Sequence, residues 1–335
     1  MSLRRLCKGL GLSLLPSLFI GPAAAAPISP EKGFSGFVSV LPASVTTQSA
    51  THTGDDNRVL ESLDSDGARE RSAAVAAIGM LRYTLRPGQT ELYFGTPPER
   101  VGEGTFQLEL GIRQQLADGS RLRLGLIPFE LLESRLWADP FVTGQARDKT
   151  RASNRGLRLG WSAIRGSQWS VDYTFLRHEV DREHSGRFLG LDAAEQALLR
   201  RDANRHQLTV DYRWQLSPRV SLRPALRYER IQAKGRAERA DVLRPQVNLF
   251  WRDRKHQVSL TAYGAFSRYD ARNPVFDQSR DARSWGLVAG YSLAEPFGWK
   301  NGQFNLFALG TRSDSDIRFY DSRTVVLAAG LGYRF

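Results

Sequence analysis

The sequence lacks most of the features that mark a helical membrane protein, a disulfide-stabilised domain or a disordered chain. Cysteine occurs once, as Cys7, so the rest of the chain can form no disulfide and no cysteine metal site. After the first 26 residues no apolar run reaches the length of about 18 residues that a transmembrane helix needs. Aromatic residues make up 10% of the chain, which is more than a disordered chain carries. The sequence therefore indicates a folded protein without helical membrane spans.

Motifs for nucleic-acid binding and for hydrolysis are also missing. Lys and Arg total 47 against 35 Asp and Glu, but these charges alternate with apolar residues instead of forming one basic face, so we expect no nucleic-acid partner. The G-x-S-x-G, H-E-x-x-H and P-loop motifs do not occur. Only His178 with Asp181 and His206 with Asp202 have the proximity of a catalytic pair, and histidines at the polar end of a strand are more often rim residues. We expect no enzyme, no catalytic residue, no metal and no cofactor.

The N-terminus has the three-part layout of a secretory signal peptide. Basic residues at 4, 5 and 8 precede an apolar run over 9–20, and small residues follow at 23–26. Pro27 is a poor residue to follow a scissile bond, so we expect cleavage after Ala25. The prediction is a signal peptide over 1–25 and an exported domain over 26–335.

Alternation of apolar and polar residues with a period of two dominates the exported chain. In 207–216 every even position is apolar or aromatic and every odd position is polar. Because successive side chains of a strand point to opposite faces, such a segment has one apolar face and one polar face. The same pattern, strong or weak, predicts 14 strands: 35–46, 73–85, 90–95, 106–116, 121–129, 157–163, 169–175, 207–216, 220–228, 243–252, 258–267, 285–293, 304–312 and 323–335.

Short turns and long connections alternate between these segments. Tight turns rich in Gly, Pro and Asp fall at 86–89, 117–119, 165–167, 217–218 and 253–255. Longer charged connections fall at 48–72, 135–154, 182–204 and 270–282. Antiparallel strands that cross a bilayer in sequence order produce this arrangement. We therefore predict an all-β fold, a single transmembrane antiparallel up-and-down β-barrel of about 14 strands, with 12 to 16 tolerated, in the bacterial outer membrane.

A soluble β-sandwich would also contain alternating strands, but two observations favour the barrel. Trp169, Trp214, Trp251, Trp285 and Tyr333 lie at or near strand ends on the apolar face, as an interfacial aromatic girdle would. The polar face carries many charges in strand interiors. A membrane barrel with a water-filled interior accommodates both features.

The last predicted strand ends the chain on an aromatic residue. Its apolar positions run from Val325 to Phe335, with Leu331 and Tyr333 on the same face, whereas Arg334 points to the opposite face. A terminal aromatic residue on an alternating strand resembles the signal that the barrel assembly machinery reads. The expected partners are therefore this machinery and the lipids of the outer membrane.

Several short motifs resemble those of a family of bacterial outer-membrane proteins known as domain of unknown function 2860. They are Phe34-Ser35-Gly36-Phe37, Leu60-Glu61-Ser62-Leu63, Leu92-Tyr93-Phe94-Gly95-Thr96, Asp118-Gly119-Ser120 and Trp137-Ala138-Asp139-Pro140-Phe141-Val142-Thr143-Gly144. The last of these is the most specific. The resemblance covers 36 to about 178 by motif and implies a barrel, but it implies no activity.

The polar face of the predicted strands is rich in arginine. If the apolar face meets lipid, 11 arginines point into the lumen: Arg82, Arg113, Arg121, Arg123, Arg158, Arg213, Arg223, Arg227, Arg244, Arg252 and Arg334. Five carboxylates share that face: Glu91, Glu109, Asp172, Asp211 and Glu229. The predicted pore-lining residues are Arg113, Arg123, Arg158, Arg213, Arg223, Arg227, Arg244, Glu109, Asp211 and Glu229. If every one of these carboxylates paired with an arginine, some arginines would still lack a carboxylate partner. The densest patch is predicted at Arg213, Arg223, Arg227 and Arg244.

This lining predicts a porin-like channel for diffusion of small polar, anionic solutes, because rings of arginine select anions. The same residues are also compatible with a lining of salt bridges that only braces the wall. Two further functions stay open at this point: an outer-membrane surface enzyme of lipase or protease type, and a structural or receptor barrel without flux.

A barrel of about 14 strands should enclose a narrow or partly plugged channel. The connection over 135–154 contains apolar residues, and we expect an external loop packed on its neighbours in preference to an infolded constriction. Another connection carries a short helix over 189–199, with Asp192 as N-cap and Glu195 three residues later. We expect this helix on the outer rim.

Overall fold

The computed structural model describes residues 28–101, 107–128 and 134–335. The predicted signal peptide, 1–25, lies outside the described residues. Within them the strands are β1 (Gly33–Gln48), β2 (Arg69–Arg86), β3 (Thr90–Gly95), β4 (Glu109–Gln115), β5 (Arg121–Ile127), β6 (Ser134–Trp137), β7 (Lys149–Ser162), β8 (Trp169–Val180), β9 (Ala203–Tyr212), β10 (Trp214–Ser217), β11 (Val220–Ala233), β12 (Ala240–Asp253), β13 (His256–Tyr269), β14 (Ala282–Ala294), β15 (Gly302–Ser315) and β16 (Ser322–Arg334).

Helices in the described residues are few and short. The α-helices are α1 (Pro98–Val101) and α2 (Ala193–Leu198), and the 3-10 helices are η1 (Asp55–Asn57), η2 (Ile164–Gly166), η3 (Arg236–Glu238), η4 (Pro296–Gly298) and η5 (Arg318–Tyr320). None of these helices is long and apolar enough to cross a membrane.

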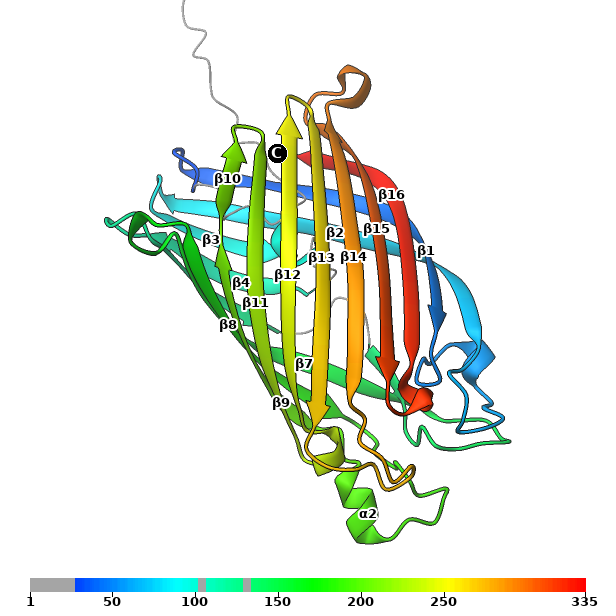
Figure 1. Ribbon diagram of the computed structural model, residues 1–335. Coiled ribbons are helices and arrows are strands. Elements are labelled where there is room, and N and C mark those ends of the chain that lie inside the picture. Colours follow the sequence, from blue (N-terminus) through cyan, green and yellow to red (C-terminus); the bar gives the residue numbers. More distant parts are fainter. Residues whose placement is uncertain (1–27, 102–106, 129–133) are drawn as a thin grey trace, which may run out of the picture.

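The strands form one closed antiparallel barrel (Figure 1). β5 and β6 pair with successive stretches of β7, and β10 continues β9 alongside β11, so the segments make up 14 positions in the wall. The remaining neighbours pair in sequence order, and β16 returns to pair with β1. The prediction of an all-β, up-and-down barrel of 14 strands is confirmed.

The first and last strands, β1 and β16, pair at the seam of the barrel. Phe37 pairs with Arg334, the Gly36 N–H donates to the Phe335 carbonyl at 2.8 Å, and the Phe335 N–H donates to the Gly36 carbonyl at 3.1 Å. Phe335 and Tyr333 are exposed on the outer face, whereas Arg334 lies on the other face. The predicted orientation of the last strand is therefore confirmed.

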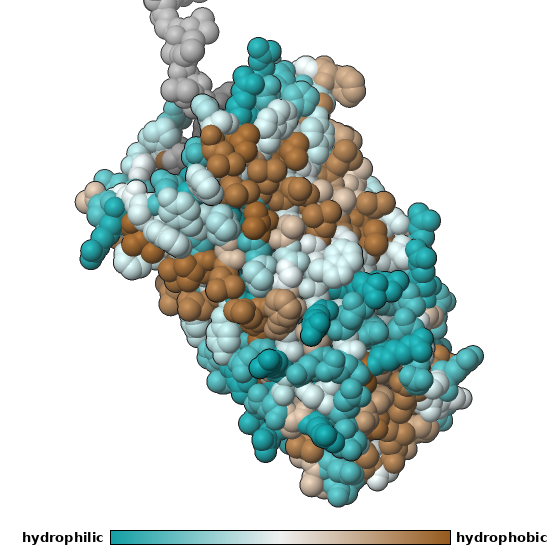
Figure 2. Space-filling model, in the orientation of Figure 1, coloured by the Kyte–Doolittle hydropathy of each residue, from teal (hydrophilic) through white to brown (hydrophobic). Residues whose placement is uncertain are grey.

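The two faces of the wall differ as the alternation predicts. On β5, Leu122, Leu124 and Leu126 are exposed on the outside, while Arg121 and Arg123 alternate with them on the inside. Figure 2 shows the outer apolar side chains as a broad brown region over the half of the wall nearer the turns. A continuous apolar surface of this extent requires an apolar surrounding, which a lipid bilayer supplies.

Aromatic side chains mark the edges of this apolar region. Trp169, Trp214, Trp285 and Tyr333 are 51%, 56%, 56% and 42% exposed on the outer face. Trp251 lies half-buried on the same face. The predicted aromatic girdle therefore has its residues on the outside of the barrel.

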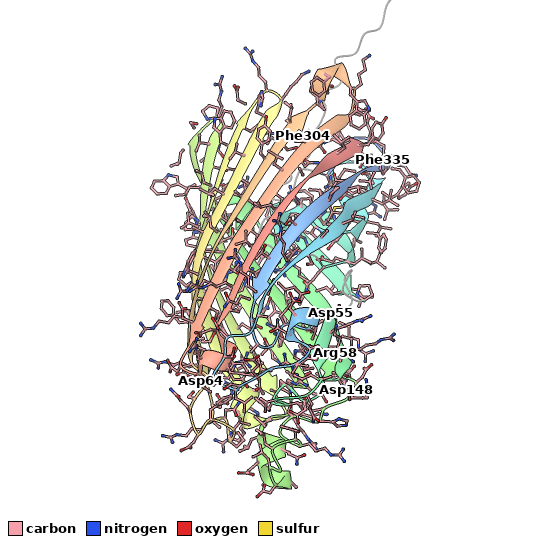
Figure 3. The ribbon with its side chains drawn as sticks, turned by 90° about the vertical axis from the view of Figure 1, so that its right-hand side faces the viewer. Asp55, Arg58, Asp64, Asp148, Phe304 and Phe335 are labelled. Carbon is pink, nitrogen blue, oxygen red and sulfur yellow. The ribbon has the colours of Figure 1, made fainter. Side chains whose placement is uncertain are left out.

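The two ends of the barrel carry different connections. At one end, uppermost in Figure 1, lie the short turns, the C-terminus and η4; at the other end lie the long loops and α2. Figure 3 shows Phe304 and Phe335 toward the turn end and Asp55, Arg58 and Asp148 toward the loop end. In bacterial barrels the short turns face the periplasm and the long loops face outward.

The long loops pack on one another and form a structure that we term the loop cap. It comprises 49–68, 138–148, 181–202, 234–239, 270–281 and 316–321. Its apolar core consists of Ala50, Leu60, Phe141, Leu199, Ala237, Ile317 and Phe319, each at most 4% exposed. The Phe141 and Phe319 rings lie 5.5 Å apart, centroid to centroid. Loops from all around the rim therefore meet in a single small core.

The most specific sequence motif, 137–144, lies at the centre of the loop cap. The Trp137 indole N–H donates to the His52 carbonyl at 3.1 Å. The Asp139 carboxylate accepts the backbone N–H groups of Phe141 and Gly186 at 3.1 Å and of Phe188 at 2.9 Å. Each residue thus joins this loop to a different neighbour, which explains the motif in structural terms.

A buried arginine holds the same loop to the first one. Arg147 donates to the carbonyls of Asn57, Ala50 (2.8 Å) and Pro140 (3.2 Å), and its guanidinium lies 4.3 Å from the Trp137 ring centroid. Desolvation by burial lowers the pKa of Arg147 to about 10. The carbonyl oxygens and the aromatic face compensate this charge in place of a carboxylate.

The sequence makes specific predictions for the connection over 135–154 and for the helix over 189–199. The loop over 138–148 lies outside the lumen and packs on its neighbours, as expected, but its flanks belong to strands β6 and β7. The helix predicted over 189–199 is α2, where Asp192 and Glu195 form a capping box. Neither loop supplies an element inside the barrel.

Candidate functional site in the barrel lumen

Within the described residues, the element inside the barrel is α1, in the connection between β3 and β4. Gly95 ends β3 with φ of 140°, and a Cβ there would lie 2.1 Å from the Gly79 carbonyl oxygen. Only glycine fits this position, where the chain leaves the wall. The Thr96 N–H donates to the Gly79 carbonyl at 2.7 Å, and α1 begins at Pro98. The sequence pattern favours an external loop for 135–154, and the element that folds inward is α1, which no sequence pattern marked.

α1 contacts opposite sides of the barrel. Val101, only 2% exposed, packs in an apolar cluster with Leu41, Ile78, Val288 and Phe307 from β1, β2, β14 and β15. On its other side Arg100 donates to the Thr174 hydroxyl of β8 at 2.9 Å. Because β8 and β15 lie across the barrel from each other in the strand order, α1 spans the lumen.

Glu99 of α1 joins a compact network of charges on β4, β5, β7 and β8. Its carboxylate lies 2.5 Å from the Arg123 guanidinium and 3.8 Å from that of Arg158. Arg158 also contacts Asp172 at 2.8 Å and Glu109 at 3.4 Å. All five side chains are at most 19% exposed, so each charge depends on its partners for compensation.

A cavity of about 220 Å³ lies between α1 and the turn end. Glu99 and Arg100 bound it on the side of the plug, and Gly119, Gly166 and Ser167 of the turns bound it at the other end. Eight arginines line it: Arg100, Arg113, Arg121, Arg123, Arg158, Arg213, Arg223 and Arg227. Among its described lining residues only three carboxylates oppose them: Glu99, Asp172 and Asp211. The cavity therefore carries an excess of positive charge.

Of the four arginines predicted to form the densest patch, three line the cavity and one does not. Arg213, Arg223 and Arg227 line the cavity, and Arg223 forms a bidentate pair with Asp211 at 2.6 Å for each contact. Arg227 donates to the Thr209 hydroxyl at 3.2 Å. Arg244 is not among the lining residues, because its guanidinium stacks 3.5 Å from the Tyr263 ring centroid.

The other predicted pore-lining residues also include some that line the cavity and some that do not. Arg113, Arg123 and Arg158 line the cavity. Together with Arg121 they give β4, β5 and β7 four lining arginines, against three from the predicted patch. Glu109 is only 2% exposed and accepts from Tyr93 and Arg158. Glu109 therefore lies behind the cavity as a structural counter-charge.

Glu229 differs from its expected role. Strand alternation predicts it as a partner of the arginine patch, but its carboxylate accepts from Arg205 at 2.6 Å. Arg205 faces inward on β9 and is absent from the predicted lining. The inward alternation of 203–211 is the signal that could have identified it.

Glu99 and Arg100 are the residues of α1 that line the cavity and that sequence reasoning missed. Their helix has only four residues, so no periodic pattern marks it. The Pro97-Pro98 pair is a local sign that β3 ends there.

The wall opposite the charged residues is lined by neutral polar groups. The Ser292 hydroxyl donates to Asn305 at 2.9 Å, Gln303 donates to Ser292 at 3.0 Å, and Asn305 donates to Ser39 at 3.3 Å. These four side chains are at most 2% exposed. The lumen is therefore closely packed along β14 to β1, and open space is left on the arginine side.

The histidines considered as catalytic candidates make other contacts. His178 Nδ1 lies 2.9 Å from the Asn154 side-chain oxygen, and His206 Nδ1 lies 2.7 Å from the Tyr173 hydroxyl. The Asp202 carboxylate binds the Val180 N–H and Lys234 instead. In the part of the chain that the structure describes, no group of three His, Cys, Asp or Glu residues could hold a metal ion.

Comparison with solved structures finds outer-membrane proteins at low sequence identity. A FadL homologue of Pseudomonas aeruginosa shares 12% identity, with 90% of each chain covered and a TM-score of 0.42. An anion-selective porin from Comamonas acidovorans shares 9%, with 91% of this chain and 99% of that chain covered and a TM-score of 0.43. The CymD monoaromatic hydrocarbon channel shares 8%, with 91% and 89% covered and a TM-score of 0.47.

No curated protein matches the sequence. The protein-family comparison covers 33–334, which is nearly the whole described barrel. It confirms the family that the short motifs indicated. The chain belongs to the family described as protein of unknown function (DUF2860).

Proposed function

We propose that this barrel is an outer-membrane channel whose arginine-rich lumen admits small polar, anionic solutes. The observation that carries the proposal is the cavity at the turn end, with eight arginines against three carboxylates among its described lining residues. A guanidinium can donate two parallel hydrogen bonds to a carboxylate or phosphate group, so such a lining favours anions over cations.

The apolar outer face of the barrel supports a location in the outer membrane. The apolar outer face and the polar inner face are those of a barrel whose exterior meets lipid. Closure of the sheet leaves the backbone hydrogen bonds of the wall satisfied within the barrel, as a lipid environment requires.

The size of the cavity limits the solute. At about 220 Å³ it is smaller than the range of about 300–1,000 Å³ typical of sites for drug-sized ligands. A solute with one or two acidic groups and few other atoms fits such a volume. The arginines on both sides of the cavity would contact both ends of a compact dianion.

Passage through the barrel requires movement of two elements. α1 spans the lumen on the loop side of the cavity, and the apolar core of the loop cap lies at the far end. The described conformation therefore supports entry of a solute from the turn end and a closed outer side. A channel of this kind should open only intermittently.

Reversal potentials in planar bilayers under a salt gradient test the proposal. The wild-type protein should prefer anions, and the double variant Arg213→Gln, Arg227→Gln should lose most of that preference, because two donors leave the cavity. Arg86→Gln with Arg219→Gln is the matched control, since it removes two exposed arginines from the turn end without changing the cavity lining. Cation preference of the wild-type protein would contradict the proposal, as would equal selectivity of the lumen variant and the control.

A further inference from the structure

The outward side chains of β16 change from apolar to basic at one point. From Phe335 back to Val325 every second residue is apolar and faces outward. At about 3.4 Å per residue and a tilt of about 40°, this stretch is about 26 Å high. The apolar band of a membrane barrel is about 25 Å tall. Arg323, the next outward residue, therefore lies at the edge of the band on the side of the loop cap.

Neighbouring strands show the same change at the same level. On β14, Arg283 follows Trp285 toward the loop end, and on β13, Arg268 follows Phe266. The pairing register places Arg312 of β15 opposite both Trp285 and Arg323. We term these outward residues the arginine belt: Arg71, Arg268, Arg283, Arg312 and Arg323. In Figure 2 the lower edge of the brown region gives way to teal side chains toward the loop end.

Carboxylates gather at one side of the arginine belt: Asp241 stands opposite Arg268, and Asp241, Asp281, Asp314 and Asp316 line a hollow with Arg268 and Arg283. Arg312 contacts Asp314 at 2.7 Å, and Asp314 stands opposite Arg283 in the register. Within the described residues, Arg283 and Arg323 have no ion-pair partner, although both are exposed on the outer face. Arg323 stands directly opposite Arg312, and like charges in such a pair destabilise the sheet unless an anion lies between them.

The other edge of the apolar band has a different composition. There the outward positions carry Trp169, Trp214 and Tyr333, exposed by 42% or more. The five arginines of the belt therefore lie on the loop side of the band, and aromatic residues take the outward positions on its turn side. Headgroups of the lipid leaflet that surrounds the loop end occupy the level of the belt, and guanidinium groups bind phosphate in bidentate geometry.

We propose that the arginine belt binds phosphate groups on the headgroups of glycolipids in the outer leaflet. The proposal rests on the outer-membrane location proposed above, and it does not depend on anion passage through the lumen. Arg312 and Arg323 form the central part of the site, because they stand directly opposite each other on adjacent strands. Arg283 lies on the next strand, where Asp314 is its cross-strand neighbour and Asp281 and Asp316 line the same hollow. A phosphate there would replace the like-charge contact between Arg312 and Arg323 with two attractive contacts.

Titration of the purified full-length barrel in maltoside micelles with diphosphorylated lipid A, and with the same lipid after removal of its phosphates, tests the proposal. The wild-type protein should bind the phosphorylated form more tightly, and Arg283→Gln with Arg323→Gln should reduce that preference by about tenfold or more, since each basic residue near an anionic lipid surface contributes to binding. Equal binding of both lipids by the wild-type protein would overturn the proposal. Retention of the full preference by the double variant would also overturn it.

Two controls keep the result specific. Arg86→Gln with Arg219→Gln removes the same charge from the turn end and should retain the preference. Heat-modifiable migration on gels shows whether each variant is folded, and Arg323→Lys should retain part of the preference if charge matters. Inorganic phosphate in excess should not displace the lipid; displacement would assign the belt to free phosphate and refute the lipid site.

The lumen variant separates this proposal from the channel. Arg213→Gln with Arg227→Gln should retain the lipid preference, and the belt variant should retain the ion selectivity of the wild-type protein. Loss of selectivity without loss of lipid preference would leave the belt proposal intact, because the two sets of arginines face opposite sides of the wall.

Discussion

The two ends of this barrel differ in the side chains that fill them. At the loop end, Leu60, Phe141, Leu199 and Phe319 form an apolar core that excludes water. At the turn end, short turns leave a cavity lined by arginines. Apolar packing makes a seal that needs no ligand, whereas an excess of like charge is stable only with water or counter-ions present. The comparison teaches that the charged lining lies toward the turn end and the apolar packing toward the loop end, so variants at the two ends test different interactions.

Between these ends, α1 combines both kinds of contact. Val101 lies in the apolar cluster on the β14 and β15 side, and Glu99 lies in the ion network on the β5 and β7 side. Because α1 has only four residues, the loss of a few contacts is enough to release it. Variants at α1 and at each end therefore measure how the three regions depend on one another.

The largest effect is expected from Glu99→Gln. This change leaves Arg123 and Arg158 without one carboxylate, and removal of one partner from a buried ion pair costs about 3–5 kcal/mol. We expect α1 to detach from the charged wall and the single-channel conductance in planar bilayers to rise. Glu31→Gln, which changes an exposed residue near the turn end, is the control. Unchanged conductance would show that α1 does not separate the two ends.

Phe319→Ala should open the loop cap. Phe319 is fully buried and contacts Phe141 and Phe276, and loss of a buried phenyl group costs about 3 kcal/mol or more. Hydrogen exchange in 138–148 and 316–321 should accelerate while exchange in the strands is unchanged. Phe297→Ala makes the same change at the turn end, where Phe297 is fully exposed, and should have almost no effect. Equal protection in both variants would contradict the apolar seal.

Asp139→Ala should have a smaller effect confined to two loops. Its carboxylate accepts three backbone N–H groups, and buried donors left without an acceptor cost about 1–3 kcal/mol. Limited proteolysis should cut 181–202 faster in this variant. Asp118→Ala is the control, since it removes a carboxylate that accepts the Ser120 N–H in a turn. The loop cap of this control variant should remain resistant to proteolysis. Resistance of the loops in Asp139→Ala would refute the role assigned to Asp139.

The smallest effect is expected from protonation of Asp202, which should lower the stability of the loop cap in acid. Burial opposes the charged form, but hydrogen bonds from Lys234 and the Val180 N–H hold the pKa of Asp202 below its usual range. With the folded-state pKa depressed, this contribution is present above the unfolded value of about 4 and is lost as pH falls through the folded value. It amounts to about 0.2–1 kcal/mol, because the pair is largely exposed. Amide protection in 181–202, measured relative to the intrinsic exchange rate at each pH, should fall in acid, and Asp202→Asn should remove that dependence; an unchanged dependence would exclude Asp202 as its source.

Much of the fold was predictable because strand alternation is a local property. Each strand in 207–216 or 323–335 shows its own two faces without knowledge of its neighbours, and the parity of turns and loops orders the strands. The placement of Trp285 and Phe335 on the lipid face follows in the same way. The capping box at Asp192 and Glu195 was also visible, since it depends on residues three apart.

The candidate site was predictable only in part. Arg113, Arg123, Arg158, Arg213, Arg223 and Arg227 could be assigned to the lumen by parity, and all six line the cavity. Arg244 has the same parity but stacks on Tyr263, and Glu229 has the same parity but pairs with Arg205. Alternation determines which face a side chain occupies, and the pairing register then determines which neighbour it contacts.

The sequence by itself determined the class, the number of strands and the faces of the wall, because these depend on residues one or two positions apart. Tertiary structure alone decided that α1 crosses the lumen, that Glu99 meets Arg123, and that the loops close one end. These contacts join segments that lie far apart in the chain, and only closure of the barrel brings them within reach. The free energy of each contact depends on burial, which no local pattern encodes.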